Sequence, residues 1–588
     1  MLAVVQLARR AYGAYKKQIL MLTALGFVGG ILEGIGINAV IPLLTFVLGL
    51  ENPATDILSR AIQTCFEWAH IPFVPKFLLG FIVVLFIGKA FVTLLLNYIQ
   101  IGITNEYERQ TRAKLFRMVL HASWPYLLRQ KLGNLETVLM IDTPAATAMI
   151  TKISFTITLM TSLFMYLVVA FSISSVVTLT TFVIGILTFV CLRPLMDRVH
   201  ALSRARAALY RDTLHHTTEH VSGLKTVKAF GVEAQAISLG EQLYAEIKKR
   251  STRIQMLQQV ATQAVAPIGI IYIASILSLA FKTPFISLAA LPAILYLIYR
   301  IFTYVQQLQN NVQYISELAP HLERVVLYET NAIQGTEAPS GTLPFSFIKE
   351  LSFNQVSFAY ETGKEVLHTL SFTIPKGSMV GIVGPSGAGK TTCVDLILRL
   401  LQPTKGTIEL DGVAASHIAL SEWRKHVAYV SQDFFIIHGT IRDNIRFYDD
   451  ALSDTDVWEA ARMAHIDEFI RTCEKGLDTQ VGERGIMLSA GQRQRLVIAR
   501  ALARKPSLLI LDEATSALDN ESEAHIKHVI QELKGHITVV AIAHRLSTIM
   551  GSDKLVVLSD GNVAETGSPQ ELLANTNSYF YKVYTIGQ

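Results

Sequence analysis

The sequence predicts a polytopic α-helical membrane domain with six transmembrane helices, fused to an α/β domain of the P-loop type. Two observations carry this prediction. Charged residues make up only 17% of the 588 residues and hydrophobic residues 51%, whereas ordinary soluble domains carry about 25% charged residues. From Phe347 onward, by contrast, strand patterns alternate with helix patterns around a glycine-rich loop. We therefore expect a membrane half followed by a globular half.

Six apolar stretches are each long enough to cross a bilayer, which takes about 20 residues. They lie near 18–48, 77–103, 145–171, 174–194, 257–281 and 284–306. Lysine and arginine crowd the segment before the first stretch and the second and fourth connections, whereas the third and fifth connections are nearly uncharged. The positive-inside rule then places both termini in the cytoplasm. We expect a multi-pass protein of the bacterial inner (plasma) membrane with its globular half in the cytoplasm.

The predicted domain boundaries follow from these patterns. The membrane domain covers residues 1–331, a Gly/Pro-rich linker covers 332–346, and the α/β domain covers 347–588. Both basic connections read as extended helices with a short reversal, at Trp124–Gly133 and at Gly223–Glu233, which favours docking against the second domain over solvated loops.

The first external connection has apolar residues at helical spacing between Pro53 and Ile71. It predicts a short amphipathic helix that either lies on the outer membrane surface or caps the helix bundle.

Charge, cysteines and the N-terminus exclude several classes. A net charge of +5 indicates no nucleic-acid surface, and basic residues beside membrane spans account for it. Cys65, Cys191, Cys393 and Cys473 are scattered, so their spacing predicts neither a disulfide framework nor a zinc site. The first residues lack the pattern of a cleaved signal peptide.

The segment from Gly384 to Thr391 reads Gly-Pro-Ser-Gly-Ala-Gly-Lys-Thr, a complete phosphate-binding loop between an apolar strand and a helix. Glycines let backbone N–H groups approach phosphates, Lys390 supplies charge to the β/γ oxygens, and Thr391 offers its hydroxyl to Mg²⁺. The residues expected to hold ATP here are Gly384, Ser386, Gly387, Gly389, Lys390, Thr391 and Thr392.

Two carboxylates end a second apolar strand, Leu508 to Leu511. Asp512 can hold Mg²⁺, directly or through water, and Glu513 can polarise an attacking water as general base. The alternative for such a pair is a purely structural helix cap, but the phosphate loop in the same chain favours the catalytic interpretation.

Between these two motifs lies Leu488-Ser489-Ala490-Gly491-Gln492, and here the chain resembles the ATP-binding cassette (ABC) superfamily. The usual signature is Leu-Ser-Gly-Gly-Gln, so Ala490 departs by one methyl group. The resemblance implies that Ser489 and Gly491 face the γ-phosphate of an ATP held by a partner subunit, and that Gln492 also belongs to the ATP-binding residues. Ser489 also precedes a helix, whose N-terminus suits an anion.

Further positions match the family one by one. Tyr360 resembles the aromatic that stacks on adenine, and Gln432 the glutamine that senses Mg²⁺ and contacts the membrane domain. Asp519 ends Ser516-Ala517-Leu518-Asp519, which resembles the loop that crosses between paired cassettes, and His544 resembles the histidine at the γ-phosphate. The resemblance thus assigns catalysis to Glu513, His544 and Gln432, and Mg²⁺ to Thr391, Gln432 and Asp512.

Six spans followed by one cassette is the half-transporter layout of type I exporters and flippases. The resemblance implies ATP hydrolysis coupled to export, with alternating access driven by a cassette dimer. A homodimer is sufficient, because one chain carries both Glu513 and His544, and a heterodimer stays open. The alternative is a regulatory protein or an ATP-gated channel, against which the complete Glu513 argues.

The substrate is the least defined feature. The predicted external helix and Leu32-Glu33-Gly34-Ile35-Gly36-Ile37 resemble features of lipid-linked oligosaccharide flippases, which indicates a lipid, glycolipid or other amphipathic substrate; a peptide or drug exporter is the alternative. Lys89 and Arg300 lie within the second and sixth spans and indicate an anionic head group. Pairing of one of them with Glu33, or snorkelling to an interface, is the alternative.

Overall fold

The computed structural model describes residues 2–47, 57–130, 132–280, 291–337, 341–360, 363–513, 520–542 and 549–585. The chain divides into two compact units, one of Met1–Ala122 with Leu127–Thr336 and one of Ser123–Tyr126 with Glu337–Gln588. The linker expected at 332–346 stays a prediction.

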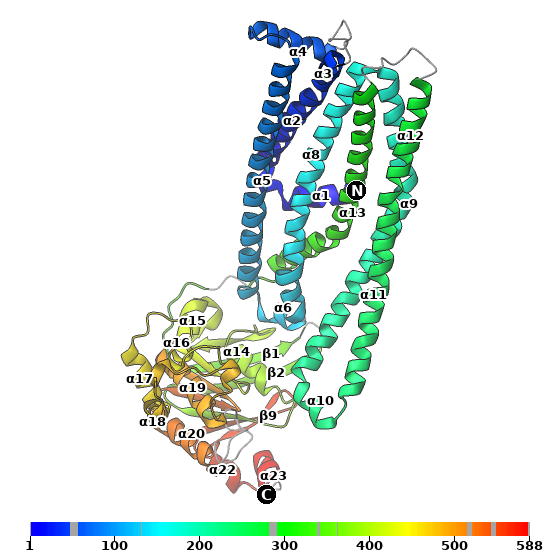
Figure 1. Cartoon of the computed structure of the whole chain (residues 1–588). Helices are drawn as coiled ribbons and strands as arrows, with labels where there is room; N and C mark the ends of the chain where they lie inside the picture. The colour runs from blue at the N-terminus through cyan, green and yellow to red at the C-terminus, as the bar shows by residue number, and fades with distance from the viewer. Residues whose placement is uncertain are drawn as a thin grey trace. The chain divides into compact units, whose positions relative to one another are not determined.

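In its described residues the first unit is built from helices (Figure 1). The described helices up to Gln334 are α1 (Leu2–Ala11), α2 (Lys16–Asn38), α3 (Val40–Val47), α4 (Ile57–Trp68), α5 (Pro75–Leu120), α6 (Trp124–Arg129), α7 (Leu132–Thr137), a π-helical turn (Val138–Asp142), α8 (Thr143–Ile173), α9 (Ser175–Ser222), α10 (Leu224–Phe230), α11 (Glu233–Gln263), α12 (Val265–Ala280) and α13 (Leu291–Gln334). Helix α13 packs against α8 and α9, while α2 packs against α5 and α8.

Five described helices are long and apolar enough to cross a membrane. They span Gly13–Phe46, Pro75–Leu120, Leu135–Ile173, Ser175–Ser222 and Glu233–Leu279, and they contain the second and third predicted spans and most of the first, fourth and fifth. The sixth prediction, 284–306, begins outside the described residues and continues into α13.

The long helices extend well beyond their apolar stretches, as predicted. Helix α5 has 46 residues and α9 has 48. Short helices reverse the chain where expected: α6 follows α5, and α10 joins α9 to α11. Gly231 ends α10 at φ +64°, a left-handed conformation that costs glycine least.

Close packing of α2 against α8 depends on glycines four residues apart, Gly26, Gly30 and Gly34. A Cβ added at Gly26 would lie 2.9 Å from the Thr161 hydroxyl, and one at Gly34 would lie 3.1 Å from Val169. Small residues at this spacing let helix backbones approach in a membrane, where van der Waals contact drives association.

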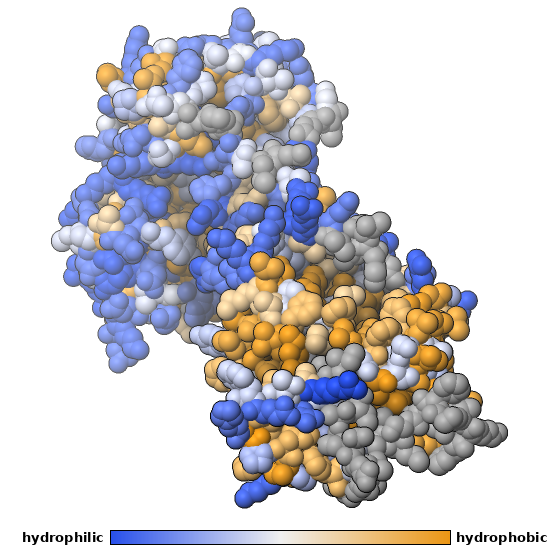
Figure 2. All heavy atoms as spheres, turned by 90° about the horizontal axis from the view of Figure 1, so that it is seen from above, coloured by the Kyte–Doolittle hydropathy of each residue, from blue (hydrophilic) through white to orange (hydrophobic). Residues whose placement is uncertain are grey.

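The outer surface of the helical unit is rich in hydrophobic side chains. Figure 2 shows these side chains gathered over the helices, whereas the surface of the second unit is largely hydrophilic. On α5, Val84, Ile87, Phe91 and Leu94 are all strongly exposed and recur at helical spacing, which is typical of a lipid-facing stripe.

Helix α4 lies at the end of the bundle near α3 and α5 (Figure 1). Its Ile62 and Phe66 are buried together with Ala39 and Leu78, and the buried Ser59 hydroxyl donates to the Asn38 side-chain oxygen at 3.1 Å. Of the two arrangements considered for the external helix, these contacts correspond to the cap over the bundle.

The second unit contains two sheets. The strands are β1 (Glu350–Ala359), β2 (Glu365–Pro375), β3 (Met379–Val383), β4 (Lys405–Leu410), β5 (Val413–Ala414), β6 (Val427–Val430), β7 (Leu508–Asp512), β8 (Thr538–Ile542), β9 (Lys554–Ser559) and β10 (Asn562–Gly567). A six-stranded sheet has the order β10-β9-β3-β8-β7-β6, and a four-stranded antiparallel sheet the order β2-β1-β4-β5.

Helices cover both faces of the larger sheet. They are α14 (Lys390–Ile397), α15 (Leu420–His426), α16 (Ile441–Arg446), α17 (Asp454–Met463), α18 (Asp467–Thr472), α19 (Ala490–Ala503), α20 (Asn520–Leu533), α22 (Pro569–Ala574) and α23 (Tyr579–Thr585). Strand β7 shows why the strands read as continuous apolar runs. Leu509 and Leu511 pack with α17 and α19, whereas Leu508 and Ile510 pack with α14 and the smaller sheet.

Candidate functional site

Strands β3, β6, β7 and β8 run parallel to one another, so their carboxyl ends share one edge of the sheet. That edge is where open α/β sheets bind ligands. The phosphate loop follows β3, Gln432 follows β6, and Asp512 and Glu513 end β7. The fold therefore brings together motifs that lie far apart in sequence.

The phosphate loop needs its glycines. Gly384, Gly387 and Gly389 have φ of +154°, +83° and +95°. A Cβ at Gly384 would lie 2.2 Å from the Leu558 carbonyl oxygen, and one at Gly389 would lie 2.4 Å from Leu367. These backbone conformations favour glycine, and the loop leads into the N-terminus of α14, where backbone N–H groups attract an anion.

Lys390 is the first residue of α14 and is buried. Its Nζ donates to the carbonyl oxygens of Gly384 and Pro385 at 2.9 and 3.0 Å. Burial lowers the pKa of Lys390, while the charges of Glu513 and Asp512 oppose that shift. The ammonium thus lies inside the loop, between backbone oxygens and close to the carboxylates of β7.

Asp512 is buried and Glu513 is partly exposed at the end of β7. The Glu513 N–H donates to the Ile542 carbonyl at 2.9 Å, and its φ of +48° is left-handed. Such a conformation is costly for a residue with a Cβ and gathers at functional sites. The turn presents Glu513 beyond the strand while Asp512 stays within the sheet.

Two residues of this edge had not been predicted. The Tyr429 hydroxyl donates to Asp512 Oδ2 at 3.1 Å, and Asp395 on α14 lies close enough for the Asp512 charge to act on it. Tyr429 lies on β6, three residues before Gln432, and β6 pairs with β7. Their role depends on strand order, which single-sequence patterns do not supply.

Several other predicted residues of this edge are accessible, whereas Thr392 is buried. Gln432, Thr391 and Ser386 are exposed. Tyr360 follows β1, and its hydroxyl lies 3.5 Å from the Thr392 hydroxyl, so the aromatic ring and the phosphate loop are neighbours, as adenine stacking requires.

Ser489 is the N-cap of α19. Its side chain accepts from the Gln492 N–H at 3.2 Å, and the Gln492 Oε1 accepts from the Ser489 N–H at 2.8 Å. This capping box fixes the helix start. Ser489 is exposed, Gly491 is buried, and the preceding Ile486 and Met487 are 78% and 71% exposed.

Two predicted site residues, Asp519 and His544, lie outside the described residues, together with the rest of the 516–519 loop.

A second polar cluster lies inside the helical unit. Glu33 of α2 is 3% exposed, and its Oε1 pairs with Lys89 Nζ at 2.6 Å and with an Arg300 nitrogen at 2.9 Å. The Arg300 Nε donates to the Tyr166 hydroxyl at 3.2 Å, and the guanidinium lies 4.9 Å from the Tyr304 ring. Both cations singled out in the sequence therefore meet the same carboxylate, so the pairing with Glu33 that was the alternative to a head-group role is present, with one positive charge in excess.

Comparison with known proteins matches both halves of the chain. The family model "ABC transporter" matches residues 367–516, and "ABC transporter transmembrane region" matches residues 38–282. "Heterocyst differentiation ATP-binding protein HepA" of Nostoc sp. is 31% identical over 95% of this chain and 92% of that protein. "ATP-dependent lipid A-core flippase" of Legionella pneumophila is 30% identical over 86% of this chain and 90% of that protein.

Among solved structures, that of a bacterial Atm1-family ABC exporter with ATP bound is similar in fold, with a TM-score of 0.79. It is 23% identical and covers 98% of this chain and 99% of that chain.

Proposed function

This chain belongs to the ABC transporter family, and from that premise we propose that it is a lipid flippase that works as a dimer and takes an amphipathic substrate with an anionic head group. It is a multi-pass ABC exporter whose cassette binds and hydrolyses ATP to drive transport. The proposal adds the substrate class, the partner and the bacterial inner membrane as location.

One observation carries the substrate class: two cations share one carboxylate in the interior of the helical unit. The cluster of Glu33, Lys89 and Arg300 has a formal charge of +1, and the two cationic side chains keep 27% and 28% of their surface exposed. A charge at membrane depth costs about 2.5–3.5 kcal/mol on insertion scales and marks a substrate path by default. An anion of the substrate would neutralise the excess.

The similarity to proteins named lipid A-core flippases favours a phosphate-bearing lipid as the source of that anion. Arginine and lysine both bind phosphate, and arginine does so in a forked geometry. The buried rings of Tyr166 and Tyr304 pack beside the Arg300 guanidinium and fix its position.

ATP hydrolysis follows from the cassette's own side chains. Lys390 and the backbone N–H groups of the phosphate loop hold the phosphates. Glu513, presented at the end of β7, accepts the proton of the attacking water. Tyr360 stacks on the base. His544 and Asp519 are proposed for the γ-phosphate and for the contact between cassettes, on the family resemblance.

Magnesium fits the donor set at this edge of the sheet. Hydroxyl, amide and carboxylate oxygens are the ligands it prefers, and Thr391, Gln432 and Asp512 offer them from three segments that meet there. When bound, the ion would neutralise charge that develops on the phosphate oxygens.

A dimer is supported by the signature. Ser489 and its exposed apolar neighbours Ile486 and Met487 form a surface that a second cassette would cover, with Ser489, Gly491 and Gln492 at the partner's ATP. One chain carries every part of such a site, so two identical chains can form two sites and a homodimer suffices. Glu513 argues against a channel that is only gated by ATP, because gating needs no general base.

The substrate class is tested in proteoliposomes with Lys89→Ala, Arg300→Ala and a control, Lys76→Ala, at an exposed position on the same helix as Lys89. Each cluster variant leaves Glu33 paired with the other cation, so neither variant leaves the buried carboxylate without a partner. We expect stimulation of ATPase by phosphate-bearing lipids to fall severalfold in both, with basal ATPase retained and Lys76→Ala like wild type.

Unchanged stimulation of both cluster variants by every anionic lipid that acts on the wild type would contradict an anionic substrate. If peptides or drugs stimulate the wild-type ATPase and no lipid does, the protein is a peptide or drug exporter instead.

A further inference from the structure

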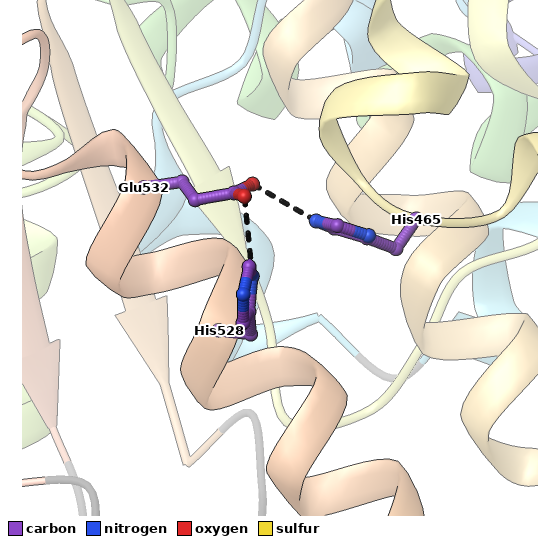
Figure 3. Close-up of side chains that lie close together, drawn as sticks. All are labelled: His465, His528 and Glu532. Atoms are coloured by element: carbon purple, nitrogen blue, oxygen red, sulfur yellow. Dashed lines mark hydrogen bonds and ion pairs between the residues drawn. The ribbon is translucent and has the colours of Figure 1, made fainter.

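Two histidines and a glutamate meet on the surface of the second unit (Figure 3). His528 and Glu532 lie one turn apart on α20, and His465 reaches them from the turn after α17. His465 Nε2 lies 2.9 Å from Glu532 Oε2, and His528 Nδ1 lies 3.2 Å from Glu532 Oε1. No other group of three such side chains converges in the part of the chain that the structure describes.

The spacing of these atoms suits a metal with nitrogen and oxygen ligands. Zinc bonds to nitrogen and oxygen of about 2.0–2.2 Å place tetrahedral donors roughly 3.3 Å apart. The three donor atoms all lie within 4.8 Å of one another, so small side-chain rotations bring them to that spacing. Two histidines and a carboxylate are a zinc ligand set that leaves the fourth position to water.

The choice of metal follows from the imidazoles. Calcium and magnesium prefer oxygen ligands, whereas imidazole suits zinc, copper and nickel. Glutamate binds a metal through its ionised carboxylate.

The backbone around His465 is fixed before any ion enters. His465 has φ +52° and ends α17, in a conformation that usually selects glycine or asparagine. Its carbonyl accepts from Arg495 of α19 at 2.8 Å. His465 is therefore tied to α19, the helix that Ser489 caps, while His528 and Glu532 sit on α20, the helix that follows the 516–519 loop.

We propose that His465, His528 and Glu532 form a binding site for zinc or a similar transition-metal ion, and that the bound ion slows ATP turnover by tying α20 to the turn between α17 and α18. A bond to the metal opposes relative movement of the signature helix and the segment after β7. Conformational steps of this kind limit the rate of many enzymes.

The binding experiment uses the full-length transporter, purified without a polyhistidine tag and stripped with a chelator. Cobalt serves as a spectroscopic probe and zinc as its competitor. The variants are His528→Ala, Glu532→Gln and His465→Asn, the last chosen because asparagine tolerates the left-handed turn. His525→Ala, an exposed histidine on the same helix, is the matched control.

We expect one equivalent of cobalt with tetrahedral absorption, displaced by zinc, in the wild type and in His525→Ala. Each of the three ligand variants should bind at least tenfold more weakly. Equal cobalt binding by wild type and His528→Ala, or binding by neither, would overturn the site and leave a hydrogen-bonded surface cluster.

Regulation is read from ATPase rates at fixed Mg-ATP with increasing zinc. Zinc that competes at the nucleotide edge would inhibit every variant alike. The proposal requires half-inhibition of wild type and His525→Ala at a zinc concentration at least tenfold lower than for the ligand variants. Equal sensitivity of all the proteins would contradict the regulatory role.

Discussion

The Tyr429 hydroxyl donates a hydrogen bond to Asp512 Oδ2 across 3.1 Å, from β6 to the end of β7. Burial, followed by the Asp512 charge, raises the pKa of Tyr429, so the phenol stays a proton donor. The bond orients the carboxylate proposed to hold Mg²⁺, as hydrogen bonds to metal-binding carboxylates commonly do.

Replacing Tyr429 with phenylalanine should therefore raise the Mg²⁺ concentration that gives half-maximal ATPase. A hydrogen bond worth about 0.5–1.5 kcal/mol corresponds to a shift of roughly two- to tenfold, visible in a magnesium titration at saturating ATP. Tyr448→Phe, at a tyrosine that is 79% exposed, should leave the titration unchanged. A Tyr429→Phe curve that overlays the wild type would show that the bond does not tune the ion.

Lys390 and Glu513 should act at different steps. Lys390→Ala removes the buried charge of the phosphate loop and should weaken ATP binding by about 10- to 100-fold, since hydrogen bonds to charged groups contribute about 1.5–3 kcal/mol. Glu513→Gln should bind ATP normally but turn over at least about 100-fold more slowly, as expected for loss of a general base. Binding of a fluorescent ATP analogue and phosphate release separate the two. Wild-type turnover by Glu513→Gln would refute the base assignment.

Ser489 should act on the ATP of the partner subunit. In a mixed dimer of Ser489→Arg and Lys390→Ala chains, one site carries both defects and the other carries neither. ATPase activity should return in that dimer, although each parent homodimer is inactive. Ser453→Arg, which disrupts an equivalent capping box at α17, controls for loss of a helix cap and should stay active. A verified mixed dimer that binds ATP without hydrolysing it would argue against action in trans.

The close approach of α2 and α8 should make Gly26 intolerant of a side chain. Gly26→Val places its Cβ 2.9 Å from the Thr161 hydroxyl, and overpacking of this kind costs about 1–3 kcal/mol. Gly102→Val on α5 is the control, because nothing lies within 4 Å of the added atom. Thermal unfolding in detergent should show a lower melting temperature for Gly26→Val alone. Equal melting of the two variants would show that α2 and α8 are not tightly apposed.

Asp395 should make the cassette less stable as pH rises. Burial, followed by the Asp512 charge, raises the pKa of Asp395 from 3.8 to about 6. The folded state then holds its proton more tightly than the unfolded state, so stability is lost as pH rises between these two values. Without nucleotide, the melting temperature of Asp395→Asn should match the wild type below that window and exceed it above. Asp450→Asn, at an exposed aspartate, should show no such divergence. A gap that is constant with pH would contradict the raised pKa.

The sequence alone determined the features that depend on local chemistry. The phosphate loop, the carboxylates after Leu511 and the Ser489 cap could be predicted, because a glycine turn, a strand end and a helix start each require particular residue types at fixed spacing. The first spans and the reversals at α6 and α10 followed from hydropathy, charge and helix-ending residues. Asp519 and His544, assigned by resemblance, lie outside the described residues and stay predictions.

Only the tertiary structure decided which distant side chains meet. Glu33 could be named as a partner for one cation, but its pairing with both Lys89 and Arg300 depends on how α2, α5 and α13 pack. The sequence of α4 predicted a helix without showing that Ile62 and Phe66 cap the bundle. The contact of Tyr429 with Asp512 depends on strand order. His465 lies far from His528 and Glu532 in sequence, so the cluster arises only because the turn after α17 folds against α20. Residue spacing within one segment cannot predict such a contact.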